Sequence, residues 1–142
     1  MPLNTDADIA EVLRSVKTVA LLGASHKPER PSYGVMRFLL LKGYTVFPVN
    51  PGLAGTELLG QSVYGALADI PQLVDMVDVF RNARFLPQIV EEVIQCKARI
   101  LWMQLDVIDL EAAKLAEANG VSVVMDRCPA IEWPRLKAVG LL

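Results

Sequence analysis

Five short apolar runs recur along the chain, and stretches of mixed polarity separate them. The runs span residues 17–23, 44–50, 75–80, 99–105 and 121–126. They are rich in valine, isoleucine and aromatic residues, and most are nearly continuous rather than alternating between apolar and polar positions. Continuous runs of this length are typical of strands that are buried on both faces of a parallel sheet. The pattern therefore predicts five parallel strands.

Between the runs, apolar residues recur at the spacing of amphipathic helices. The expected helices span 6–15, 33–43, 84–97 and 109–120, with a short final helix that Pro134 breaks. The glycine-rich connection 51–74 predicts only one short helix, near 66–69. Strands that alternate with helices form right-handed crossovers. We therefore predict one α/β domain over 1–142, with a doubly wound, Rossmann-like, five-stranded parallel sheet flanked by helices. We expect the strand order 3-2-1-4-5, in which the numbers follow the chain.

This order predicts where a ligand would bind. Doubly wound sheets bind ligands beyond the carboxyl ends of their strands, at the point where the strand order reverses. In the expected order, that point lies between the first and fourth strands. The residues expected at this edge are Gly23–Ser25 and Gln104, with Asn50–Pro51 and Phe80–Arg81 on neighbouring strands.

The loop after the first strand is longer and more basic than a simple connector needs to be. It reads GASHKPERPSYGV over residues 23–35. Backbone N–H groups at a helix start carry the positive end of the helix dipole and form an anion site. The side chains that could assist them are Ser25, Lys27, Arg30 and Ser32. Gly34 would allow a close approach to the helix. These features suit a phosphate or pyrophosphate, and the alternative is a solvated basic loop.

The known nucleotide motifs narrow the choice of ligand. The turn at 23–28 reads GASHKP, so the dinucleotide fingerprint G-x-G-x-x-G is absent, and so is the Walker pattern. The second strand ends in Asn50, whereas an NAD site places an acidic residue there to bind the ribose diol. An adenine-containing ligand with an extra phosphate fits better than NAD. A module that binds NAD(P) or another adenine nucleotide stays open as an alternative.

Composition and charge exclude several classes of protein. Hydrophobic residues make up 53% of the 142 residues, which is enough for a core without covalent crosslinks. A net charge of −2 argues against a nucleic-acid-binding surface. Two cysteines are too few for a disulfide framework, and the acidic start resembles no secretory signal. No apolar run is long enough to cross a membrane. We therefore expect a cytoplasmic protein with no membrane contact.

Six segments of the chain, in order, resemble one known family. They read GASHKPERPSYGV, VFPVNP, GQSVYGALADIP, VDMVDVFR, ILWMQLDV and VVMDRCPAIE. Together they are similar to the small bacterial CoA-binding proteins, which are stand-alone domains like the N-terminal CoA-binding domain of the succinyl-CoA synthetase α subunit. The resemblance runs from about Val19 to Glu132. It does not extend to the synthetase's second domain or its phosphorylated histidine, so it implies no ligase reaction.

The resemblance implies that coenzyme A is the cofactor and that matching positions hold it. The residues implied in the site are Gly23, Ala24, Ser25, Lys27, Arg30, Tyr33, Gly34, Asn50, Pro51, Val79, Phe80, Arg81 and Gln104. The function implied is the binding of CoA or an acyl-CoA by a carrier, sensor or delivery module. Such a module would work with a protein partner or as a homo-oligomer.

One residue, Cys128, offers chemistry beyond binding. Cys128 follows the fifth strand beside Arg127, whose charge would favour a reactive thiolate. The alternative function is therefore an enzyme that uses Cys128 in CoA thiol, disulfide or acyl chemistry, and the opposing interpretation is that Cys128 packs under the final helix. His26 is the only histidine and lacks partners for a metal site, so we expect no metal and an exposed loop residue.

Overall fold

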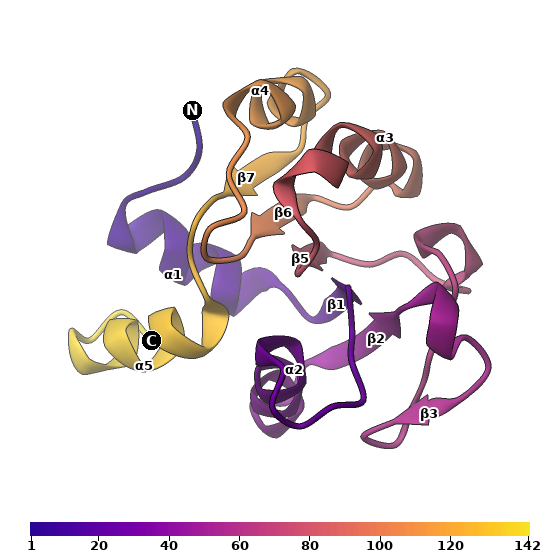
Figure 1. Cartoon of the computed structure of the whole chain (residues 1–142). Coiled ribbons are helices and arrows are strands. Elements are labelled where there is room, and N and C mark those ends of the chain that lie inside the picture. The colour runs from indigo at the N-terminus through magenta and orange to yellow at the C-terminus, as the bar shows by residue number, and fades with distance from the viewer.

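A five-stranded parallel sheet forms the centre of the computed structural model, which describes residues 1–142 (Figure 1). Its strands are β1 (Thr18–Leu22), β2 (Thr45–Val49), β5 (Met76–Val79), β6 (Ile100–Met103) and β7 (Ser122–Val124). All neighbouring strands run parallel. The predicted class, a Rossmann-like α/β fold with a doubly wound sheet, is confirmed.

The expected strand order is wrong in one respect. The observed order is β2-β1-β5-β6-β7, so the third strand along the chain pairs with β1 and leaves β2 at an edge. Pro48 lies inside β2, and proline cannot donate a hydrogen bond to a second neighbouring strand, which confines it to edge strands. The reversal point therefore lies between β1 and β5, and the end of β5 comes directly beside the loop after β1.

Helices cover both faces of the sheet (Figure 1). One face carries α1 (Asp6–Ser15), α2 (Pro31–Leu41) and α5 (Pro129–Ala138), and the other carries α3 (Leu86–Cys96) and α4 (Leu110–Ala118). Each face buries a cluster of 20 apolar residues against the sheet. Pro134 lies inside α5 and does not break it, contrary to expectation.

The connection from β2 to β5 contains more structure than its sequence predicts. The short helix expected near 66–69 is a 3₁₀ helix, η2 (Leu67–Asp69). A second 3₁₀ helix, η1 (Pro51–Leu53), begins two residues after the end of β2. Outside this connection, a third 3₁₀ helix, η3 (Ala83–Phe85), lies between β5 and α3. The unexpected element is a two-stranded antiparallel hairpin, β3 (Glu57–Leu58) and β4 (Gln61–Ser62).

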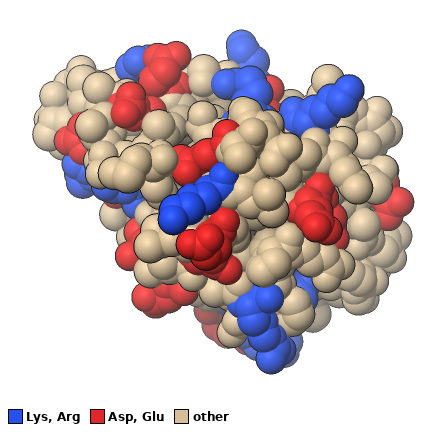
Figure 2. All heavy atoms as spheres, turned by 90° about the horizontal axis from the view of Figure 1, so that it is seen from above, with Lys and Arg blue, Asp and Glu red and all other residues tan.

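The charged side chains are mixed over the surface. Figure 2 shows lysines and arginines interspersed with acidic side chains, so the face in view offers no extended basic area. None of the helices combines the length and apolar character required to traverse a bilayer.

Candidate functional site

The loop after β1 begins with a glycine that the fold requires. Gly23 has a φ of 84°, which favours glycine. A Cβ built on Gly23 would lie 2.9 Å from the carbonyl oxygen of Phe80, at the end of β5. The N–H groups of Gly23 and Ala24 both donate to the carbonyl of Val49, at 3.1 and 3.2 Å. These contacts anchor the loop to both neighbouring strands, and residues 25–30 project beyond the sheet.

The N-terminus of α2 has no cap within the protein. Arg30 occupies the cap position without a side-chain hydrogen bond, and the first turn contains no acidic residue. The backbone N–H groups of Ser25, His26 and Ser32 donate to no acceptor in the protein. Unpaired amides at a helix start attract anions. This end of α2 can therefore bind a phosphate.

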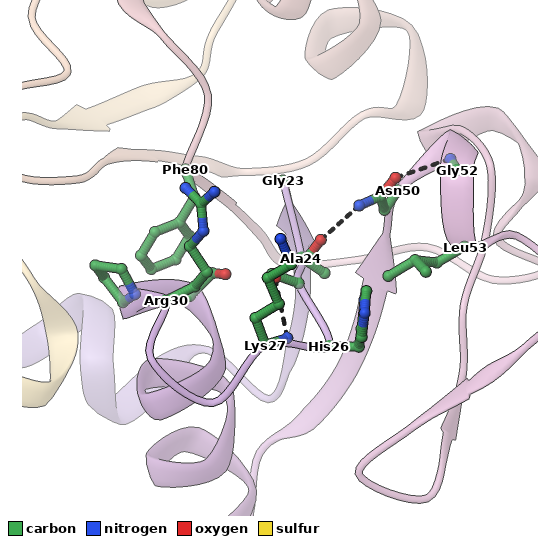
Figure 3. Close-up of a pocket in the computed structure, with 12 residues that line it drawn as sticks. Gly23, Ala24, His26, Lys27, Arg30, Asn50, Gly52, Leu53 and Phe80 are labelled. Atoms are coloured by element: carbon green, nitrogen blue, oxygen red, sulfur yellow. Dashed lines mark hydrogen bonds between the residues drawn. The ribbon is translucent and has the colours of Figure 1, made fainter.

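A pocket of about 480 Å³ lies over this helix start, and we call it the loop pocket. It is lined by Gly23, Ala24, Ser25, His26, Lys27, Arg30, Pro31, Ser32, Asn50, Gly52, Leu53 and Phe80. None of these residues is acidic, and neither Lys27 nor Arg30 forms an ion pair. Figure 3 shows Arg30 and Phe80 on one side of the pocket and Asn50 and Leu53 on the other. The pocket is electropositive and suits a polyanion.

Asn50 joins the two loops that form the pocket. Its Nδ2 donates to the carbonyl of Ala24 at 2.7 Å, and its Oδ1 accepts from the N–H of Gly52 at 2.8 Å (Figure 3). The amide therefore holds the loop after β1 against the start of η1. An acidic residue at this position could not donate the first of these bonds.

A second hollow, the middle pocket, continues from the loop pocket along α3. It has a volume of about 650 Å³ and shares Gly23, Asn50 and Gly52 with the loop pocket. Arg81 lines it, and its guanidinium lies 4.3 Å from the ring centroid of Phe85, which lines it as well. A cation over an aromatic face is favourable, so this contact orients the Arg81 side chain.

The structure brings together most of the residues predicted for the site. Nine line the loop pocket or the middle pocket: Gly23, Ala24, Ser25, Lys27, Arg30, Asn50, Pro51, Phe80 and Arg81. The four others, Tyr33, Gly34, Val79 and Gln104, line neither pocket.

These four residues have different surroundings. Tyr33 packs against the apolar cluster, and Val79 is fully buried. Gly34 is exposed, with open space where a Cβ would stand. Gln104 is buried at the end of β6, and β5 separates it from β1, because the reversal point differs from the expected one.

Cys128 lies away from both pockets. It stands at the N-cap position of α5 without a capping hydrogen bond from its side chain, has 7% of its surface exposed and belongs to the apolar cluster on that face. Arg127 donates to Glu132 Oε1 at 2.6 Å and to the carbonyl of Asn4, so its charge is paired with a carboxylate. Pro129 begins α5. The interpretation that Cys128 packs under the final helix is confirmed.

The sequence analysis missed several lining residues. Gly52 and Leu53 line the loop pocket, and Phe85, Gln88 and Glu92 line the middle pocket. The Pro-Gly pair that follows Asn50 indicates a tight turn and could have pointed to the first two. The others come from α3 and the turn before it, where the amphipathic pattern predicts the face toward the sheet and not the face toward a pocket.

The comparisons with known proteins agree with this geometry. A family model described as a CoA binding domain matches residues 17–134. "Uncharacterized protein YneT" of Bacillus subtilis (strain 168) is 34% identical over 122 residues, which cover 86% of this chain and 89% of that protein. A solved structure titled "hypothetical protein from Pyrococcus horikoshii OT3" is 40% identical with a TM-score of 0.90, covering 96% of both chains.

A longer relative shares only part of its length with this chain. The α subunit of the ADP-forming acetate–CoA ligase I of Pyrococcus furiosus is 38% identical over 86 residues, which cover 58% of this chain and 19% of the subunit. The chain therefore spans about a fifth of that subunit. The family model, by contrast, runs from the residue before β1 to the middle of α5. Because it covers the entire central sheet, together with both pockets at its edge, the chain belongs to the CoA binding domain family.

Proposed function

We propose that this protein binds coenzyme A or an acyl-CoA, with the phosphates in the loop pocket, and serves as a carrier, sensor or delivery module. One observation carries the proposal: the uncapped start of α2 and the loop before it present unpaired amides beside Lys27 and Arg30, with no carboxylate in the pocket. CoA carries a pyrophosphate and a 3′-phosphate, so it offers more negative charge than NAD. Membership of the CoA binding domain family supports the same ligand.

The lining groups favour binding over catalysis. Backbone amides, hydroxyls and the cationic Lys27 and Arg30 hold an anion but transfer no group. His26 is the one lining side chain suited to proton transfer, and no carboxylate lines the pocket to orient it. Cys128, the candidate nucleophile, lies on the other side of the sheet from the middle pocket and is buried under α5. No observation in the structure therefore favours the enzyme alternative over the binding module.

Titration calorimetry with CoA, dephospho-CoA, NAD and ADP tests the proposal. We expect CoA to bind most tightly, and we expect dephospho-CoA to bind more weakly if a basic side chain contacts the 3′-phosphate. Tighter binding of NAD than of CoA would replace the proposal with the nucleotide-binding alternative. Native mass spectrometry of the purified protein provides an independent test, because a bound CoA would add its mass.

A matched pair of variants locates the site. Arg30→Ala removes a charge-assisted hydrogen bond, which is worth about 1.5–3 kcal/mol, so CoA affinity should fall roughly tenfold to a hundredfold. Arg37→Ala removes an exposed arginine from the same helix that lines neither pocket, and it should leave the affinity unchanged. Equal effects of the two variants, or none in a Lys27→Ala, Arg30→Ala double variant, would show that the loop is only a connector.

A further inference from the structure

A third hollow continues from the middle pocket along α3, and we call it the α3 groove. Its volume is about 720 Å³. The segment 66–74 forms one wall and the C-terminal half of α3 forms the other. It shares Ala66, Leu67 and Glu92 with the middle pocket, which in turn shares three residues with the loop pocket. The three hollows therefore lie next to one another in succession, and we call them together the path.

The lining of the path becomes steadily less polar with distance from the loop pocket. Hydrophobic residues supply 3 of the 12 lining residues in the loop pocket, 6 of 14 in the middle pocket and 7 of 12 in the α3 groove. Leu67 and Val74 are buried in the groove, and Leu73 is 72% exposed at its edge. Exposed apolar groups beside a hollow favour an apolar occupant.

The only carboxylate that lines these hollows stands at one junction. Lys27 and Arg30 line the loop pocket, Arg81 lines the middle pocket and Lys97 lines the α3 groove, whereas the carboxylate of Glu92 lies where the middle pocket meets the α3 groove. Glu92 Oε1 accepts a hydrogen bond from Gln88 Nε2 at 3.3 Å. A phosphate would be repelled at this junction, but amide groups could pair with both side chains. An acyl-CoA has the same order of groups: phosphates, then an arm with two amides, then an apolar acyl chain.

We propose that the α3 groove binds the acyl chain of an acyl-CoA whose phosphates lie in the loop pocket. This proposal rests on the proposed function and adds a preference for thioesters with several methylenes over free CoA. It also implies that the arm runs along α3, away from Cys128, which belongs to the opposite face of the sheet. Cys96 lines the groove, half-buried, and would lie beside the acyl chain.

Calorimetry with CoA, acetyl-CoA, butyryl-CoA and octanoyl-CoA tests this assignment. Burying one methylene is worth about 0.8 kcal/mol, so affinity should rise up to about fourfold for each methylene that enters the groove. A flat series in which CoA itself binds would overturn the acyl groove and leave the proposed function standing. Failure of every member to bind, CoA included, would instead remove the proposed function.

A matched pair of exposed leucines locates the effect. Leu73→Asp places a charge at the edge of the groove and should lower octanoyl-CoA affinity about tenfold while leaving CoA affinity unchanged. Leu110→Asp makes the same change on α4, where Leu110 is 59% exposed and lines none of the three hollows. It should alter neither affinity. If Leu73→Asp weakens CoA and octanoyl-CoA equally, or if Leu110→Asp has the same effect as Leu73→Asp, the assignment is wrong.

Cys96 supplies a readout that does not depend on affinity. Octanoyl-CoA should slow the alkylation of Cys96 by N-ethylmaleimide, because the acyl chain would cover the thiol, and CoA should not. The Cys128→Ser variant removes the other cysteine, so that total thiol loss reports on Cys96 alone. Equal protection by CoA and octanoyl-CoA would place another part of the ligand in the groove and overturn the proposal.

Discussion

The carbonyl oxygen of Phe80 lies 2.9 Å from the point where a Cβ of Gly23 would stand. This close approach exists because β1 and β5 are neighbours, with the loop after β1 passing over the end of β5. The φ of 84° at Gly23 adds a second reason for glycine at this position. Backbone contact with the end of β5 thus determines the conformation at the start of the loop after β1.

Gly23→Ala should damage both the fold and the site. A side chain with this positive φ costs about 1–2 kcal/mol, and contact with the Phe80 carbonyl adds to that cost. We expect the free energy of unfolding to fall by at least this amount in urea titrations, and CoA affinity to fall with it as the loop shifts. Unchanged stability would mean that the loop moves away from β5 without cost.

Gly34→Ala is the matched comparison, and its stability should change in the opposite direction. Gly34 lies inside α2, and a Cβ at this position would meet nothing within 4 Å. Alanine is favoured over glycine in a helix by roughly 0.5–1 kcal/mol, so urea unfolding should show a more stable protein. The sequence predicts that Gly34 allows a ligand to approach the helix. A loss of CoA affinity in this more stable variant would support that prediction, and an unchanged affinity would contradict it.

Some of the site could be predicted from the sequence because its residues lie close together along the chain. Lys27 and Arg30 lie within one loop, between a buried strand and a helix, and that context alone indicates an anion site. The strand order depends instead on which strands pair, and apolar runs of similar composition do not specify it. The signal that could have corrected it was Pro48, since a proline disfavours an internal position for the second strand.

The rest of the path could not be found from the sequence. The middle pocket and the α3 groove form between α3 and the connection 51–74, and this connection has little periodic pattern. The segment after its hairpin is held by non-local contacts, such as the N–H of Tyr64 donating to the carbonyl of Pro48. Such contacts depend on the tertiary arrangement and leave no local signature.

Asp78 should make the protein less stable as the pH rises. Its side chain is fully buried in β5, neither carboxyl oxygen has a hydrogen-bond partner, and burial raises its pKa well above the ordinary value. The folded state therefore retains a proton that the unfolded chain releases near pH 4. The stability that depends on this proton is fully present below that pH and is lost as the pH rises toward the folded-state pKa.

The measurement is the difference in unfolding free energy between Asp78→Asn and the natural protein from pH 4 to pH 8. It should shift in favour of the variant as the pH rises, because asparagine cannot ionise. Asp75→Asn provides the control, because its difference from the natural protein should stay flat over this range and change only below about pH 4. Burial raises the pKa of Asp75, but hydrogen bonds from the backbone N–H groups of Lys17 and Thr18, together with the charge of Arg99 and the Thr18 side chain, outweigh that effect and lower it. Its contribution is present above the unfolded pKa and is lost as the pH falls. Parallel pH profiles for the two variants would contradict this account.

Cys128 should be slow to react in the folded protein. Only 7% of its surface is exposed, and it packs in the apolar cluster beneath α5. A thiol must reach its partner sulfur for disulfide exchange to occur, so burial slows the reaction whatever the ligand. We expect incubation with CoA disulfide, followed by intact-mass analysis and peptide mapping, to give no adduct on Cys128 under native conditions and an adduct in urea.

The Arg127→Ala variant separates the two roles assigned to the arginine beside this cysteine. Arg127 pairs with Glu132, whose side chain is only 8% exposed, so its removal withdraws one of the two cations that contact a buried carboxylate. Loss of a hydrogen bond to a charged group costs about 1.5–3 kcal/mol, and the urea midpoint should fall accordingly. If Arg127 instead activated the thiol, the native protein would form a reductant-reversible CoA adduct on Cys128, and Arg127→Ala would slow its formation. That outcome would restore the enzyme alternative, since a buried structural cysteine forms no such adduct while the protein stays folded.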